Sequence, residues 1–114
     1  MKIEKFEDIL SWKKGKNMAV DIYRTFSNHK DFGFKDQIQR AAVSISNNIA
    51  EGFERQSNKE FKHFLYIAKG SCGEVRSMLN IALDLKYINS NEYKKYHDEC
   101  FNISRLISGL IKSL

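Results

Sequence analysis

Apolar and polar residues alternate with the period of an α-helix along almost the whole chain. The pattern is clearest in residues 36–53, where apolar residues recur at steps of three and four. These residues are Ile38, Ala41, Ala42, Ile45, Ile49, Gly52 and Phe53. Side chains on or beside this face are small, and they include Ala50, Ser44 and Ser46. Small side chains let neighbouring helices approach closely, so this segment is predicted to be the central helix of an all-α fold.

Three further segments follow the same helical period. With the central helix at residues 35–55, the predicted helices cover residues 8–27, 58–87 and 91–112. The chain has no proline and only six glycines, so long helices can run without interruption. Because the connections are short, we expect an antiparallel up-down-up-down four-helix bundle. A length of 114 residues is typical of one domain, here residues 1–114.

Local signals indicate where these helices begin and which face each one buries. The first helix is expected to bury Ile9, Trp12, Ala19, Ile22, Tyr23 and Phe26. Ser57, followed three residues later by Glu60, has the spacing of a capping box and predicts the start of the third helix. Asn89 and Ser90 predict a turn and cap before the fourth helix, whose apolar residues follow a coiled-coil seam.

The third helix has more apolar residues than one face of a small bundle can use. Its main apolar stripe consists of Phe61, Phe64, Leu65, Ala68, Cys72, Val75, Leu79 and Ala82. A second stripe consists of Ile67, Met78, Ile81, Leu85 and Ile88. Between them, the small residues 70–73 are interpreted as a place of close packing against the central helix. The surplus apolar surface predicts a homo-oligomer.

The charge balance favours acidic partners without identifying one. Lysine and arginine number 19 against 14 acidic residues, which gives a formal charge of +5. The opening residues mix acids with apolar side chains and lack the apolar core of a signal peptide, and no apolar run reaches the length of a membrane span. We therefore expect a cytoplasmic protein.

Residue types that carry chemistry are present but are not grouped in a recognised pattern. Cys72 and Cys100 fall on apolar faces and are expected to be reduced core residues. A di-iron bundle needs two Glu-x-x-His motifs, and only Glu60 with His63 has that spacing. The sequence contains no phosphate loop or nucleophile signature. We predict no catalytic residue, no metal, no cofactor and no enzyme activity.

Two runs of sequence resemble a known bacterial family. QIQRAAVSISNNIAEGFER at residues 37–55 and KEFKHFLYIAKGS at residues 59–71, with LKYI at residues 85–88, are similar to the four-helix-bundle proteins found in intervening sequences of 23S ribosomal RNA genes. The resemblance extends from about residue 6 to the end of the chain. The order of the motifs RAAVS, NIAEGF and FLYIAKGS is highly specific.

The resemblance implies an assembly that periodicity alone does not. That family is similar in fold to the accessory protein of diversity-generating retroelements, a basic ring-shaped homopentamer thought to hold nucleic acid and a reverse transcriptase. It implies that this chain forms a pentameric ring. The chain departs from its relatives at Ser46, where they carry proline, and at Gln39, where a second arginine is frequent. Lys35 replaces a helix-capping threonine or serine, so the cap is expected at Asp36.

A cationic stripe on the third helix is the first candidate for function. Lys59, Lys62, Tyr66, Lys69 and Arg76 recur at helical steps and share roughly one face. The cations could follow a phosphate backbone while the tyrosine stacks on a base, although lysine-rich helix faces are often only solvated. Arg40 and Arg55 of the central helix are further candidates for nucleic-acid binding.

A second candidate is a structural polar network. Glu51 and Glu74 lie among small residues on helices that are expected to touch, and Asn47 and Asn48 are close in sequence to Glu51. Buried carboxylates need partners, which could come from the same bundle or across a subunit boundary. We expect these four residues to fix helix register rather than to catalyse a reaction.

These observations favour one function over two others. The leading hypothesis is a non-enzymatic oligomeric bundle that binds RNA or another nucleic acid. The alternative is a structural or adaptor ring that binds a partner protein through its second apolar stripe. An enzyme comes third.

Overall fold

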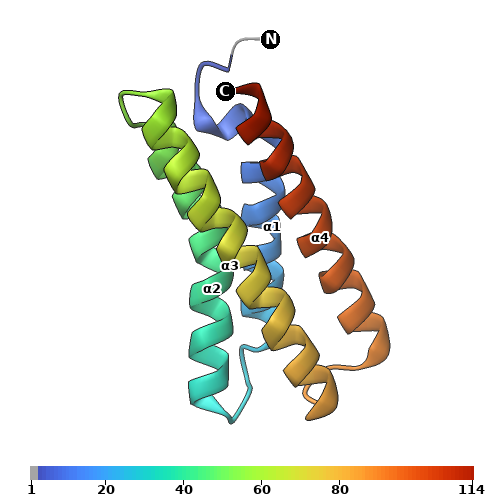
Figure 1. Cartoon of the computed structure of the whole chain (residues 1–114). Helices are drawn as coiled ribbons and strands as arrows, with labels where there is room; N and C mark the ends of the chain where they lie inside the picture. Colours follow the sequence, from blue (N-terminus) through green and yellow to red (C-terminus); the bar gives the residue numbers. More distant parts are fainter. Residues whose placement is uncertain (1–2) are drawn as a thin grey trace.

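The computed structural model describes residues 3–114 and contains four α-helices preceded by a short 3-10 helix (Figure 1). The elements are η1 (Phe6–Asp8), α1 (Leu10–Thr25), α2 (Phe32–Phe53), α3 (Asn58–Asp84) and α4 (Ser90–Ser113). The described residues contain no β-strand, so the all-α prediction is confirmed. Within the same range, no helix combines the length and apolar character that a membrane span requires.

Each helix contacts the helices before and after it in the chain, and α4 also contacts α1. In Figure 1 the α1–α2 and α3–α4 connections lie at one end of the molecule. The α2–α3 connection lies at the other end, which also holds η1 and the C-terminus. The four helices form an elongated body of 42 × 22 × 19 Å.

Helix α2 provides the closest packing in the bundle. Its buried face contains Ile38, Ala41, Ala42, Ile45, Ile49 and Gly52, as the helical period predicts, and the polar residues Gln39 and Ser46, whereas Phe53 is only half-buried. A Cβ atom added at Gly52 would lie 2.7 Å from the Cβ of Phe64 and 3.0 Å from the Cδ1 of Phe61, so α3 approaches the α2 backbone directly. On the other side, a Cβ at Gly15 of α1 would lie 3.2 Å from the Cγ2 of Ile45.

The helix ends differ from the predicted ends for identifiable reasons. Asp31, not Asp36, caps α2, because its side chain accepts a hydrogen bond from the Phe34 amide at 3.1 Å. Helix α2 therefore begins three residues before the predicted residue 35 and ends two residues before residue 55. Helix α3 ends at Asp84 rather than residue 87 because Lys86 adopts a left-handed conformation, with φ 63°.

The other boundaries agree more closely with the predictions. Helix α1 begins at Leu10 rather than residue 8, after the separate 3-10 turn, and ends at Thr25. The Ser57 side chain accepts from the Glu60 amide at the start of α3. Asn89 and Glu92 form a reciprocal capping box at the start of α4.

Several packing predictions are wrong or incomplete. Gly70 and Gly73 do not pack against α2, because a Cβ atom added at either position would meet nothing within 4 Å. Tyr23 was predicted to be buried but is 45% exposed, and Met18 occupies the core of α1 instead. Both cysteines are fully buried and free, as predicted.

Part of the second apolar stripe of α3 remains on the surface of the single chain. Met78 and Ile88 are buried in the core. Ile67, Ile81 and Leu85 are exposed, and we call these three residues the α3 apolar row. The bundle therefore does not use all of the apolar surface that the sequence of α3 provides.

Gly52→Ala and Gly70→Ala form a matched pair that tests the α2–α3 contact. Gly52→Ala should lower the free energy of unfolding by ~1 to 3 kcal/mol, because the added methyl group overpacks the contact with Phe61 and Phe64. Gly70→Ala should raise it by up to ~1 kcal/mol, because alanine favours the helix and its methyl group meets open space. Urea unfolding measures both changes. Stabilisation by both substitutions would contradict the close approach.

Candidate nucleic-acid interface

A cationic groove of about 420 Å³ lies between α3 and α4. Its four charged lining residues are Lys69 and Arg76 from α3 and Arg105 and Lys112 from α4. The remaining lining residues are Phe101, Ser104, Ser108 and Gly109. No carboxylate lines this groove, so its potential is positive along its length. We call these eight residues the α3–α4 groove.

The structure divides the predicted cationic stripe. Lys69 and Arg76 line the α3–α4 groove. Lys59 and Tyr66 are exposed elsewhere on α3, and Lys62 is half-buried. The lysines and the tyrosine of the stripe therefore do not all belong to one site.

The contribution of α4 was missed at the sequence level. Phe101, Arg105, Ser108 and Lys112 follow steps of four, three and four, so they share one face of α4. The signal was present in the sequence, on a face beside the apolar seam. Recognising it required knowing that this face lies beside Lys69 and Arg76, which only the packing of α4 against α3 establishes.

Ion pairing distinguishes the groove cations from two arginines that lie outside the groove. Arg40 pairs with Asp36 at 2.8 Å, and Arg55 pairs with Glu51 at 2.6 Å. The Arg40 pair connects successive turns of α2, the Arg55 pair connects the last turn of α2 to a residue just beyond its end, and both lie outside the α3–α4 groove. In residues 3–114, none of the ion pairs involves a groove cation. The groove is therefore the better site for an external anion.

An exposed aromatic side chain lies within this positive groove. The guanidinium carbon of Arg76 lies 5.7 Å from the centroid of the Phe101 ring, a cation–π distance. Phe101 nevertheless keeps 48% of its surface exposed. The groove therefore offers both charge and a flat apolar surface.

The polar network between α2 and α3 contains one of the four predicted residues, Asn48, together with two serines. The hydroxyl groups of Ser44 and Ser71 are 2.9 Å apart and connect the two helices. The Asn48 side chain donates to the Ser44 carbonyl oxygen at 2.8 Å and to its hydroxyl oxygen at 2.9 Å. Serine pairs of this kind satisfy polar groups at a close helix contact without burying a charge.

The other three candidates for the network are exposed in the single chain. Glu51 pairs with Arg55, two residues beyond the end of α2, and Asn47 is exposed. Glu74 lies 3.4 Å from the Gln37 side-chain nitrogen. The structure therefore does not bring Glu51 and Glu74 together within the bundle.

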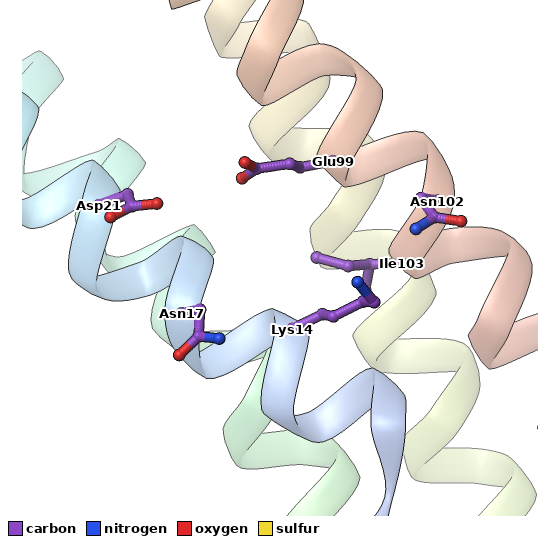
Figure 2. A pocket seen from close by; sticks show the side chains of 6 residues that line it. All are labelled: Lys14, Asn17, Asp21, Glu99, Asn102 and Ile103. Carbon is purple, nitrogen blue, oxygen red and sulfur yellow. The ribbon is translucent and has the colours of Figure 1, made fainter.

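A polar cavity of about 160 Å³ lies between α1 and α4 (Figure 2). Its lining consists of Lys14, Asn17, Asp21, Glu99, Asn102 and Ile103. In Figure 2 the carboxylate of Glu99 points from α4 towards α1, where Asp21 lies. Burial raises the pKa of the Glu99 carboxyl; Lys95 opposes this rise and Asp21 adds to it.

The thiols and histidines do not form a reactive centre in the described part of the chain. Burial raises the pKa of the Cys72 thiol to about 12 and raises that of Cys100 as well, so both remain protonated near neutral pH. Glu60 and His63 are exposed on α3. Among residues 3–114, no three His, Cys, Asp or Glu side chains are placed to hold a metal ion.

The fold and the groove together define a small four-helix-bundle protein with a cationic groove between α3 and α4. Residues 7–109 match the 23S rRNA-intervening sequence protein family, and the chain belongs to this family. It is similar to the crystal structure of a protein of unknown function from the S23 ribosomal protein family of Bacteroides thetaiotaomicron. The two chains are 29% identical with a TM-score of 0.85, over 90% of this chain and 99% of that one. No curated protein matches the sequence.

Glu99→Gln should stabilise the protein near pH 7. Because burial raises the carboxyl pKa in the folded state above the ordinary value of 4.5, the ionised side chain is less favourable in the folded protein than in the unfolded one. The contribution of Glu99 to the free energy of unfolding is therefore greatest below pH 4.5, and it is lost as the pH rises through the pKa of the folded state.

Thermal unfolding of the parent and of Glu99→Gln at several pH values measures this difference. The advantage of the variant should be present at pH 7 and should shrink towards pH 4.5. Glu4→Gln, at an exposed position, is the control and should change stability little at either pH. An advantage of Glu99→Gln that does not depend on pH would contradict the assignment.

Proposed function

We propose that this protein is a non-enzymatic, oligomeric bundle that binds RNA or another nucleic acid through the α3–α4 groove. The observation that carries the proposal is the set of four groove cations, two from each helix, with no carboxylate in the lining. None of these cations takes part in an ion pair among the described residues. A phosphate backbone is a ligand that such an arrangement suits.

The geometry of the groove suits an extended polyanion better than a single anion. Lys69 and Arg76 are seven residues apart on α3, which corresponds to ~10 Å along the helix axis. Arg105 and Lys112 have the same separation on α4. Cations spaced along both walls can neutralise successive phosphates, and the counterions released would drive binding.

RNA is the first nucleic acid to test. The matching family is described by 23S rRNA-intervening sequences, and the similar crystal structure belongs to a protein of the S23 ribosomal protein family. These descriptions concern the relatives. For this chain they supply the choice of ligand, while the cations supply the physical reason to expect binding.

We also propose that antiparallel bundles of this kind assemble into a homopentameric ring. The α3 apolar row supports assembly, because Ile67 and Ile81 of α3 and Leu85 directly after it are exposed in the single chain. Ile81 and Leu85 are four residues apart and are therefore neighbours on the surface, and neighbouring exposed apolar side chains mark interaction sites in soluble proteins. The same row supports the second candidate function, an adaptor that binds a partner protein.

Replacing Lys69 and Lys112 by glutamine should weaken RNA binding and flatten its dependence on salt. Each lost phosphate contact should reduce the slope of log affinity against log salt concentration by ~0.7 on a single strand and ~0.9 on a duplex. The matched control, Lys13→Gln with Lys30→Gln, removes the same charge from exposed positions outside the groove. Its slope should stay close to that of the parent.

Filter binding across a series of salt concentrations measures these slopes, with far-UV circular dichroism as the check on folding. Equal effects of the two double variants would show that only net charge matters. Salt-independent binding, or no binding of RNA or DNA by the parent, would contradict the function. The adaptor would then be the leading candidate, because the α3 apolar row would remain unexplained.

Light scattering at micromolar concentration should give a mass of about five times the 13.3 kDa of one chain. Ile81→Lys should lower this mass, because it places a charge in the α3 apolar row. Leu10→Lys changes an exposed leucine of α1 and should leave the mass unchanged. A mass of 13.3 kDa for the parent would contradict assembly.

A further inference from the structure

We infer that the α3–α4 groove takes single-stranded nucleic acid and that Phe101 is the residue on which a base stacks, an assignment that rests on the function proposed above. Phe101 combines two properties in one place. It is 48% exposed, and it lines a groove whose charged residues are all cations. A flat apolar ring among cations is the arrangement by which proteins hold single strands.

The contact with Arg76 prepares the ring for this role. The guanidinium lies over Phe101, with its central carbon 5.7 Å from the ring centroid. This cation–π contact favours one orientation of the ring, while 48% of the Phe101 surface stays exposed. An aromatic side chain that is already oriented loses less conformational freedom when a base stacks on it.

The positions of the cations relative to Phe101 define a path for the backbone. Arg105 is one helical turn beyond Phe101, and Lys112 is eleven residues beyond it. At ~1.5 Å per residue, Lys112 is ~16 Å from Phe101 along α4, which is the length of about five stacked nucleotides at ~3.4 Å each. A strand with one base on Phe101 could therefore place later phosphates beside Arg105 and Lys112.

A duplex uses this arrangement poorly. Its bases are stacked on one another, so that only a terminal base pair could present a face to Phe101, whereas a single strand exposes base faces along its length. The groove cations attract both forms, but only the single strand can use the ring. We therefore expect a preference for single strands that depends on Phe101.

Self-association through the same groove is a poorer explanation of the exposed ring. A two-fold contact would set the groove cations of one copy against those of another, and in the ring proposed above, whose contacts join two different surfaces, the groove would have to meet another face of a chain with a net charge of +5. Like charges brought together in an interface are unfavourable. The α3 apolar row, which does not line the groove, is the better surface for self-association.

Tyr66 is the other aromatic residue that could stack on a base. It is more exposed than Phe101, at 60%, but it does not line the α3–α4 groove. Phe101 shares the groove with Arg105 and Lys112, and Tyr66 does not. The stacking role predicted for Tyr66 from the sequence is therefore reassigned to Phe101, and comparing the two variants tests the choice.

The experiment measures the affinity of the full-length protein for three probes at one salt concentration. These are an oligouridylate of about 12 nucleotides, a ribose-phosphate strand of the same length without bases, and an RNA duplex of that length. The variants are Phe101→Ala, Phe101→Leu, Tyr66→Ala and Phe32→Ala. Phe32 is the matched control, because it is 73% exposed and lies at the start of α2, outside the groove.

Phe101→Ala should weaken binding of the oligouridylate by between about fivefold and about a hundredfold. It should leave binding of the strand without bases almost unchanged, so that the preference of the parent for bases disappears. Phe101→Leu should behave in the same way, because leucine keeps apolar contact with Arg76 but has no aromatic face. Phe32→Ala and Tyr66→Ala should bind all three probes as the parent does.

Several results would overturn the assignment. These are equal binding of the two single strands by the parent, full activity of Phe101→Leu, a loss carried by Tyr66→Ala, or a preference for the duplex. A change in the light-scattering mass of Phe101→Ala would also overturn it, because the ring would then belong to a protein interface. Failure of the parent to bind any probe would refute the nucleic-acid function itself, and the two failures are therefore distinguishable.

Discussion

The close contact of α2 with α3 at Gly52 is the constraint on which the rest of the structure depends. Because Gly52 has no side chain, Phe61 and Phe64 lie directly against the α2 backbone, and this contact fixes the rotation of α3 about its own axis. Successive residues of a helix differ by about 100° in direction. If α3 were turned about its axis by the angle of one residue, Lys69 and Arg76 would point away from α4 and the groove would be lost.

Helix α4 is positioned by contacts of another kind. Its buried face packs on the core. The hydroxyl group of Tyr96 forms a hydrogen bond with that of Thr25 on α1, and the sulfur of Cys100 lies 3.3 Å from the sulfur of Met18, also on α1. Beside these contacts lies the polar cavity that contains Glu99, so the α1–α4 contact is less completely packed than the α2–α3 contact. The groove therefore lies between α3, which packs closely on α2, and α4, whose contact with α1 is less completely packed.

The sequence was sufficient to predict the helices, the small buried face of α2 and the burial of both cysteines, because each depends on local periodicity. It was insufficient wherever the answer depended on the neighbouring helix. Gly70 and Gly52 are both glycines in small-residue surroundings, yet only Gly52 faces another helix. Phe101 has the spacing of an ordinary surface position on α4, and only the fold places it beside Arg76. Two helix ends were also predicted wrongly: Asp31 caps the start of α2, and Lys86 ends α3 by adopting a left-handed conformation.

The distribution of ion pairs gives an energetic reason for regarding the groove as a site. Exposed pairs such as Arg40–Asp36 contribute little, but they give Arg40 a carboxylate within one turn of helix. The groove does the opposite, because it gathers four cations from two helices with no carboxylate in its lining. Their mutual repulsion opposes folding, and a bound phosphate chain would remove it. Since a ligand that binds only the folded state stabilises that state, a polyanion in this groove would both occupy the site and strengthen the α3–α4 contact that forms it.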